Sequence, residues 1–159
     1  MGKEKNDNLS PRIANRRAFH EYHILEKLET GMMLTGSEVQ SIRRGQISLA
    51  EGFATIETNP PHLLLHQVDI ALYPHAGQNN HLPKRSRKLL AHKREIARLE
   101  SLLASKSATL VPLAVYFVRG RAKVELGVGV GKKAFDKRQD MKNRDAQRAI
   151  QRGMTRKVL

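Results

Sequence analysis

The sequence contains no cysteine and no long apolar run. The absence of cysteine excludes disulfides and thiolate metal sites, although it does not reveal the redox compartment. The longest apolar run is Leu110 to Val118, nine residues that include Pro112, whereas a membrane-spanning helix needs about 20. The first ten residues are polar and lack the apolar stretch of a secretory signal. We therefore expect a soluble, cytoplasmic protein with no membrane partner.

Acidic residues are also few, because 15 Asp and Glu stand against 29 Lys and Arg, a formal charge of +14. Such an excess of one sign usually accompanies a polyanionic partner: nucleic acid, an anionic membrane surface or an acidic protein. The chain has no tryptophan, three tyrosines and four phenylalanines, which disfavours single-strand binding by base stacking on aromatic side chains. The composition favours recognition of a folded RNA by its shape, phosphates and 2′-hydroxyls.

Between about residues 16 and 130, short β-branched or aromatic runs alternate with turn residues, which is typical of a mostly-β domain. The candidate strands cover residues 18–28, 52–58, 62–72, 110–118 and 121–130. Between the last two, Arg119-Gly120 predicts a tight hairpin, because glycine readily adopts a positive φ.

Two helices are expected between these strands. Ser37 and Gln40 have the spacing of a capping box, and Gly45 provides a C-terminal stop, so the first helix is short. The second covers about residues 86–104, where four apolar residues share one helical face: Leu89, Ile96, Leu99 and Leu103. A mostly-β fold with an OB-like closed barrel of five to six strands and two to three short helices fits this order.

The character of the sequence changes at residue 132. The last 28 residues hold ten Lys or Arg and three Asp, a net charge of +7 and half of the total. Their few apolar residues bury too little surface to offset an ordering cost of roughly 1–2 kcal/mol per residue. Residues 132–152 contain neither Pro nor Gly, and Asp140 and Arg144 are spaced to pair along a helix, so helix preference is good.

These patterns divide the chain into three parts. We expect residues 1–13 to be a disordered N-terminus and residues 14–131 to form the OB-like RNA-binding barrel. Residues 132–159 form a basic C-terminal tail, which we expect to be disordered alone and helical when bound.

A basic stretch lies at the centre of the chain. Its six cations are Lys84, Arg85, Arg87, Lys88, Lys93 and Arg94. No Asp or Glu occurs between Asp69 and Glu95, so these cations have no local acidic neighbours. Cations at the start of a helix interact unfavourably with its dipole. A sequence that tolerates this cost indicates a phosphate partner for the cations. A solvated basic face is the alternative.

Neither metal, nucleotide nor catalytic chemistry is supported by the motifs. His20 and His23 lack the zincin spacing, and on a strand they would point to opposite faces. The alternating Gly127, Gly129 and Gly131 fit neither a Walker loop nor a dinucleotide fingerprint. They predict a flexible strand exit that lets the tail swing. We therefore expect no metal, no cofactor and no enzymatic activity.

Short segments spread between residues 14 and 152 carry a further signal. They are Asn15-Arg16-Arg17-Ala18, His20-Glu21-Tyr22, Gly36-Ser37-Glu38-Val39, Ser41-Ile42-Arg43, Asn80-His81, Arg87-Lys88-Leu89-Leu90, Thr109-Leu110-Val111-Pro112-Leu113, Ala122-Lys123-Val124-Glu125-Leu126, Gly131-Lys132-Lys133 and Asp136-Lys137-Arg138. In order and spacing they resemble the small protein B family, the partner of transfer-messenger RNA (tmRNA). Two positions depart from the family pattern: Val130 stands where Lys is usual, and Ser107 where a turn Gly is usual.

The resemblance implies an OB-like barrel that binds the tRNA-like domain of tmRNA. It also implies that the complex enters stalled ribosomes for trans-translation, with the tail probing the empty mRNA channel. An elongation factor bound to the same RNA would be a further partner, and the protein would act as a monomer. On the residues alone, a basic ribosomal protein embedded in rRNA remains the alternative, and an RNA nuclease a distant third.

The expected site residues fall into two sets. The RNA-binding set is Asn15, Arg16, Arg17, Glu29, Lys84, Arg85, Arg87, Lys88, Leu90 and Lys123. The ribosome-binding set in the tail is Gly131, Lys132, Lys133, Phe135, Asp136, Lys137 and Arg138.

Overall fold

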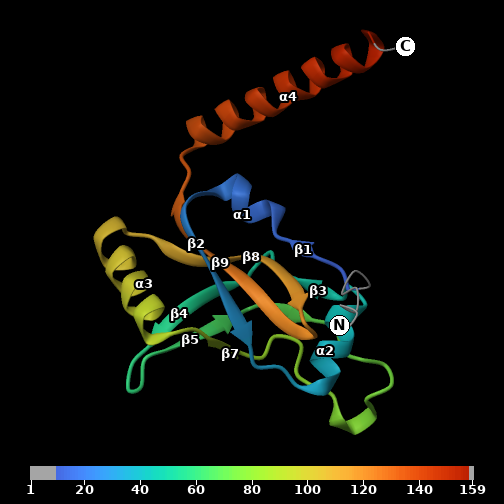
Figure 1. The fold of residues 1–159 in the computed structure, drawn as a ribbon, viewed down its shortest axis with the longest axis vertical. Coiled ribbons are helices and arrows are strands. Elements are labelled where there is room, and N and C mark those ends of the chain that lie inside the picture. The colour runs from blue at the N-terminus through green and yellow to red at the C-terminus, as the bar shows by residue number, and fades with distance from the viewer. Residues whose placement is uncertain (1–9, 158–159) are drawn as a thin grey trace, which may run out of the picture.

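The computed structural model describes residues 10–157 of the chain (Figure 1). In chain order the elements are β1 (Ile13–Ala14), α1 (Arg16–Glu21), β2 (Tyr22–Met32), α2 (Gly36–Arg43), β3 (Ile47–Ser48), β4 (Phe53–Glu57), β5 (His62–His66), β6 (Asp69–Ile70), η2 (Gly77–Asn79), β7 (Arg87–Leu90), α3 (Lys93–Lys106), β8 (Thr109–Val118), β9 (Arg121–Gly131) and α4 (Ala134–Lys157). The expected mostly-β fold is confirmed, with four α-helices in the described part of the chain rather than two or three.

The strands pair antiparallel throughout. β8 pairs with both β4 and β9, so the hydrogen-bonded pairs run from β8 through β4, β5, β7, β2 and β9 and return to β8. The β8–β9 hairpin turns at Arg119-Gly120 as predicted, and both residues have a positive φ. The β4–β8 junction is narrow, since Ala54 and Leu110 are its one aligned pair. β3 and β6 form a separate two-stranded sheet.

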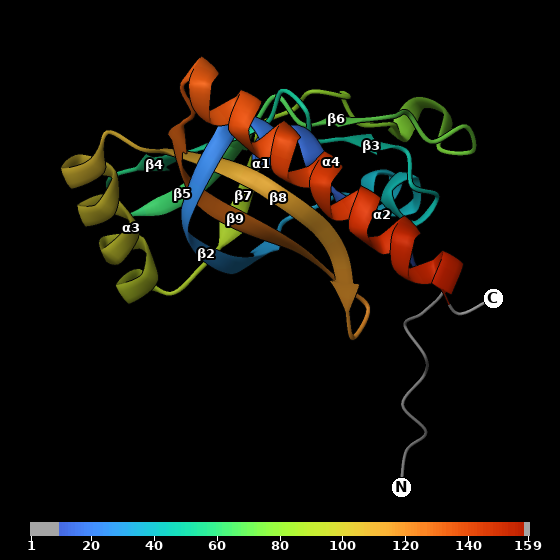
Figure 2. The same cartoon turned by 90° about the horizontal axis from the view of Figure 1, so that it is seen from above.

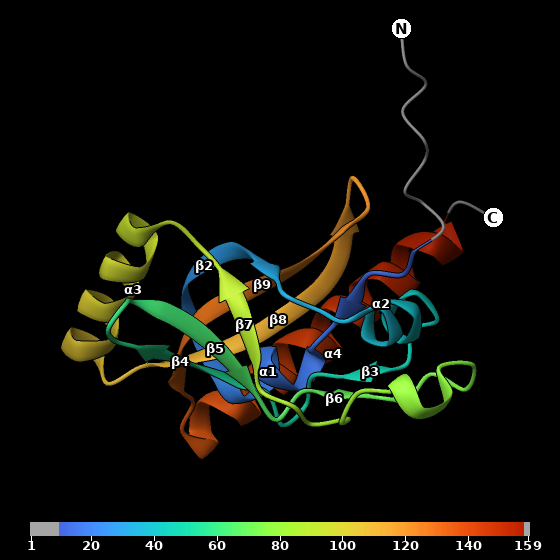
Figure 3. The ribbon, with the colours of Figure 1, turned by 90° about the horizontal axis from the view of Figure 1, so that it is seen from below.

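Helices α2 and α3 lie at opposite ends of this strand assembly (Figure 3). The main core joins apolar side chains of the strands to those of the two helices. It includes Ile42, Leu63, Leu65, Leu89, Ile96, Leu99, Leu110, Val124 and Leu126. Burial of this apolar surface is the principal stabilising contribution to the fold.

Strand β8 is buried along nearly its whole length because both of its faces are covered. Val111 packs beneath α1 against Ala18, whereas Phe117 faces the main core. Two residues six positions apart would share a face of a regular strand. The register shift between Pro112 and Ala114 reverses the faces, and it also accommodates a proline inside a central strand.

Two of the predicted boundaries are wrong for identifiable reasons. The strand expected over 18–28 begins only at Tyr22, because the Asn15 side chain caps a helix by accepting the Ala18 amide at 3.3 Å. The helix expected over 86–104 begins at Lys93, where Glu95 accepts the His92 amide at 2.9 Å. Residues 87–90 are instead strand β7, paired with β5 and β2.

Helix α3 ends at Ser107, whose φ of 49° and ψ of 45° are left-handed. A side chain in this region costs about 1–2 kcal/mol, which glycine avoids. Ser107, noted above as a departure from the family pattern, therefore lies at a position whose backbone conformation favours glycine.

The N-terminal boundary also differs from expectation. Ile13 pairs with Val115 in β1, so this part of the segment 1–13 belongs to the sheet, while residues 1–9 lie outside the described residues. At the other end, α4 is one continuous helix of 24 residues that projects from the strands (Figure 1). The disorder expected for the tail is thus not confirmed. Within residues 10–157, no helix is both long and apolar enough to span a membrane.

Candidate nucleic-acid interface

A groove of about 700 Å³ opens between β2, the end of β7, the start of α3 and the start of β9. It brings together three of the predicted RNA-binding residues: Glu29, Leu90 and Lys123. The strand register explains this convergence, because Gly31 of β2 is aligned with both Leu90 and Lys123. A Cβ at Gly31 would lie 3.3 Å from that of Leu90, so the glycine leaves room for the leucine side chain, which is 53% exposed.

The Glu29 carboxylate in this groove is oriented by Tyr116, whose hydroxyl donates a hydrogen bond to it from β8. Burial, followed by the hydrogen bond and the negative charge of Glu29, raises the pKa of Tyr116 to about 12. Tyr116 therefore stays a donor at physiological pH. The Arg12 guanidinium lies 4.7 Å from the centre of the Tyr116 ring and 3.6 Å from Glu125. Sequence reasoning missed both Tyr116 and Arg12 at this site, because no local pattern links them to Glu29.

The central basic stretch is divided by the alternation of strand β7. Lys84, Lys88 and Leu90 are exposed, whereas Arg87 and Leu89 point into the core. The stretch therefore exposes single cations such as Lys84 and Lys88, and it does not form a continuous basic surface.

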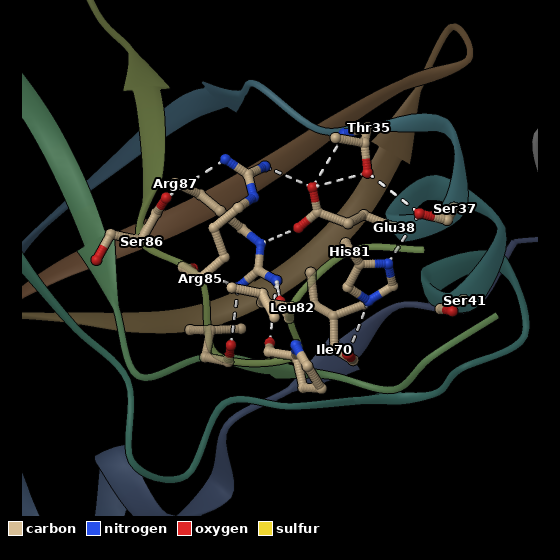
Figure 4. A network of polar contacts seen from close by, with 12 residues as sticks. Thr35, Ser37, Glu38, Ser41, Ile70, His81, Leu82, Arg85, Ser86 and Arg87 are labelled. Atoms are coloured by element: carbon tan, nitrogen blue, oxygen red, sulfur yellow. Dashed lines mark hydrogen bonds and ion pairs between the residues drawn. The ribbon is translucent and has the colours of Figure 1, made fainter. Parts of the chain in front are cut away.

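The surface position predicted for Arg87 is wrong, because its side chain is 0% exposed. Figure 4 shows the network of polar contacts to which the side chain belongs. Its Nε donates to Glu38, Nη1 donates to the carbonyls of Val68 and Arg85 at 2.8 Å, and Nη2 donates to the carbonyl of Pro83 at 3.0 Å. With its donors committed to the core, the Arg87 guanidinium cannot reach a phosphate.

Glu38 is the anionic centre of this network and is also 0% exposed. Burial alone would raise its pKa, but the Thr35 amide at 3.0 Å, Arg85 and Arg87 outweigh that effect and lower the pKa to about 2. Burial conversely lowers the pKa of Arg87, and Glu38 opposes that shift. The N-cap residue of α2 is Thr35, two residues before the predicted Ser37. The side chain that accepts the N-cap amide is Glu38 and not the predicted Gln40.

Ser37 and His81 belong to the same network. The Ser37 hydroxyl lies 2.9 Å from Nδ1 of His81, and Nε2 of that ring lies 2.9 Å from the Ile70 carbonyl. In a hydrolytic triad the third group is a carboxylate, whereas here it is the backbone carbonyl of Ile70. The Ser37–His81 pair instead joins α2 to the chain around β6. Across residues 10–157, no three His, Asp or Glu side chains converge as metal ligands.

Asn15 is likewise buried, with 6% of its surface exposed. Its Nδ2 donates to the carbonyls of Leu49 at 3.1 Å and Pro112 at 2.9 Å, and its backbone amide donates to Leu113 at 2.7 Å. Asn15 therefore holds α1 against β8, and its predicted place on the RNA-facing surface is wrong. Arg16 and Arg17 beside it are exposed, and Arg17 pairs with Glu21 and Glu51, each at 2.9 Å.

The predicted tail residues separate into two groups at the start of α4. Lys132 and Asp136 face the strands and α1, whereas Lys133, Phe135 and Arg138 are exposed. Phe135 is 68% exposed, and every residue from Met141 to Thr155 is exposed as well. This helix presents the tail's positive charge to solvent along its length, as a polyanionic partner requires.

The flexible strand exit predicted from the glycines is wrong for two of them. Gly127 and Gly129 are buried within β9. A Cβ at Gly127 would lie 2.8 Å from Leu113, and one at Gly129 would lie 3.0 Å from Tyr22. These glycines allow close packing beneath α1, while Gly131 at the end of the strand has open space around it.

The chain is similar to known proteins along most of its length. The family model described as SmpB protein matches residues 12–156. The SsrA-binding protein of Saccharopolyspora erythraea is 47% identical over 156 residues, covering 98% of this chain and 96% of the relative. That of Carboxydothermus hydrogenoformans is 50% identical over 140 residues, covering 88% and 93%. A solved structure described as "tmRNA-SmpB: a journey to the center of the bacterial ribosome" is 45% identical, with a TM-score of 0.65 over 79% of this chain and 87% of that one. The chain belongs to the SmpB family.

Proposed function

We propose that this protein binds tmRNA and carries it to stalled ribosomes for trans-translation. Family membership over residues 12–156 is the observation that carries this function. The groove at Glu29, Leu90 and Lys123 is our proposed contact with the tRNA-like domain of the RNA. The protein then acts as a monomeric, cytoplasmic, non-catalytic adaptor, and an elongation factor on the same RNA is a further partner.

The chemistry of the groove suits a folded RNA. The half-exposed Leu90 can pack against a sugar or base, and the Glu29 carboxylate can accept hydrogen bonds from ribose hydroxyls. Lys123 in the groove and Lys88 on β7 supply positive charge for the phosphates on either side. A carboxylate among cations is unfavourable for a plain phosphate surface, so Glu29 indicates selection of 2′-hydroxyls.

The two parts of the chain have separate roles in this proposal. The ring of strand pairings supports an OB-like closed barrel over residues 14–131, which binds the RNA. The basic tail over residues 132–159 enters the empty mRNA channel, where α4 lies along negatively charged rRNA. Its exposed charge and lack of a core of its own support an element that is helical when bound along rRNA.

The salt dependence of RNA binding tests the groove. Removing a lysine that neutralises one phosphate should lower the log–log slope of affinity against salt by about 0.9, the value for a duplex. We expect this reduction for Lys123→Ala, and weaker binding with an unchanged slope for Glu29→Ala. Lys142→Ala removes the same charge from the exposed surface of α4 and should leave the slope unchanged. Equal slope changes in Glu29→Ala and Lys123→Ala would reduce the role of Glu29 to general electrostatics.

A further inference from the structure

Lys132 lies at the junction of barrel and tail in an unusual environment for a lysine. Its side chain is only 7% exposed. The Nζ atom donates to the Phe19 carbonyl of α1 at 3.0 Å and to the carboxylate of Asp140, two turns into α4. Its backbone amide donates to the Glu21 carbonyl at 2.8 Å. One residue therefore bonds to α1 through both its backbone and its side chain, and to α4 through the side chain.

A second connection lies one turn before Asp140. The Asp136 carboxylate is 3.3 Å from Nε2 of His23 on β2 and accepts the Lys133 amide at 3.3 Å. Asp136 and Asp140 are four residues apart, so their negative charges repel each other along the helix. The buried ammonium of Lys132 offsets this repulsion, and its hydrogen bond lowers the pKa of Asp140. The first two turns of α4 are thereby attached at two points to α1 and β2.

The neighbouring cations behave differently. Lys133 and Arg138 are exposed and free to meet a phosphate, whereas moving Lys132 to rRNA would leave Asp140 without its ammonium partner. The Asp140 carboxylate would then face Asp136, four residues away, without the Lys132 ammonium to offset the repulsion. Lys133 and Arg138 are therefore exposed cations of the kind that can contact rRNA, whereas Lys132 is not.

We propose that Lys132 is a positioning residue that sets the direction in which α4 leaves the barrel, by joining Asp140 to the backbone of α1. The ribosome then meets a tail that already points along one path, and the adjacent exposed cations make the rRNA contacts. This inference rests on the proposed function only where it concerns the ribosome, because the attachment itself is a property of the free protein.

The direction of α4 can be measured in the free protein, since the chain has no cysteine that would compete for a label. Spin labels on Ser101→Cys in α3 and Gln147→Cys in α4, both exposed, report the distance between the barrel and the tail by double electron–electron resonance. We expect a narrow distribution in the parent. Lys132→Met and Asp140→Asn should each broaden it, and the double variant should broaden it no further, because both changes break the same contact.

Matched controls separate attachment from charge. Lys133→Met removes the same charge from the exposed neighbour and should keep the distribution narrow, and Lys132→Arg should restore most of the order because it keeps the donor. Thermal melts exclude unfolding as the cause. An unchanged distribution in Lys132→Met, or equal broadening in Lys133→Met, would overturn the proposal.

Tagging of a stalled peptide in a reconstituted translation system gives the second readout. Lys132→Met should keep its tmRNA affinity but lose tagging about tenfold if the productive orientation falls to about a tenth of the population. Asp140→Asn should match it, and the double variant should lose no more. A direct rRNA contact by Lys132 instead predicts normal tagging by Asp140→Asn and overturns the positioning role. Failure of the parent to tag would refute the proposed function and leave the measured orientation as the test of the attachment.

Discussion

At the scale of single residues, the most consequential feature is that acidic and basic side chains are paired in the interior. Glu38 and Arg87 are both fully buried, and they connect α2 to β7 and to the chain between Val68 and Pro83 (Figure 4). Replacing one partner of such a pair typically costs about 3–5 kcal/mol, because the other charge is left buried and uncompensated. The network is therefore expected to control stability and not RNA binding.

Stability should depend on pH through Glu38. Its pKa is about 2 in the folded protein against 4.5 as the reference value, so the ionised form stabilises the fold. The contribution is complete above about pH 4.5 and is lost as the pH falls towards 2. The difference of 2.5 pKa units corresponds to about 3 kcal/mol. Urea unfolding between pH 6 and pH 3 should show this loss.

Two variants test this pH dependence. Glu38→Gln should be less stable than the parent at pH 6, and the difference in unfolding free energy between the two should narrow as the pH falls towards 3. Glu100→Gln, on the exposed surface of α3, should keep the pH dependence of the parent. A constant gap between parent and Glu38→Gln across this range would show that ionisation of Glu38 does not stabilise the fold.

At the scale of the elements, helix α1 organises the end of the molecule from which the tail leaves. Asn15 fastens it to β8 and to the Leu49 carbonyl, and Ala18 packs on Val111 in a small cluster separate from the main core. Seen from above, α4 passes over α1 and β8 (Figure 2). The backbone of α1 also receives both bonds from Lys132. The six-residue helix thus connects the packing of the strands to the direction of the tail.

The tight packing beneath α1 predicts different costs for two glycines of β9. A methyl group at Gly127 would meet Leu113 at 2.8 Å and Ile24 at 3.2 Å, and overpacking of this kind costs roughly 1–3 kcal/mol. Gly127→Ala should therefore lower the midpoint of chemical unfolding, while Gly131→Ala, with open space around it, should not. If both variants instead changed tail mobility equally and left stability unaltered, the glycines would be hinges after all.

At the scale of the whole molecule, the strand domain before residue 132 and the tail should be separable. The main core and the cluster under α1 lie entirely before residue 132, and residues 1–131 retain a net charge of +7. A chain truncated after Gly131 should unfold cooperatively. It should bind tmRNA within about threefold of the full chain, roughly 0.6 kcal/mol, and give almost no tagging. Calorimetry, RNA titration and reconstituted translation measure these three properties.

The outcomes of the truncation distinguish the roles of the two parts. Loss of cooperative unfolding would mean that α4 contributes to the fold of the strand domain. Loss of tmRNA affinity would place the RNA site in the tail, and full tagging would remove the tail from the ribosomal step.

Sequence reasoning succeeded where the signal was local. Alternating apolar runs located β4, β8, β9 and the hairpin at Arg119-Gly120, because strand periodicity and positive φ depend on adjacent residues. The helix preference of residues 132–152 agrees with α4, although the sequence predicts that the tail is helical only when bound. Glu29, Leu90 and Lys123, which the family resemblance places in the RNA-binding set, line one groove, and their contact with RNA stays a prediction.

Only the tertiary structure could decide which polar side chains face solvent. Arg87 and Lys88 are adjacent in one basic run, yet the pleat of β7 directs one to a carboxylate 49 residues away and the other to solvent. Lys132 and Lys133 separate in the same way, because the partner of Lys132 on α1 lies 113 residues away. Charge and identity are properties of a residue, whereas burial and pairing belong to contacts that form only when distant strands and helices pack together.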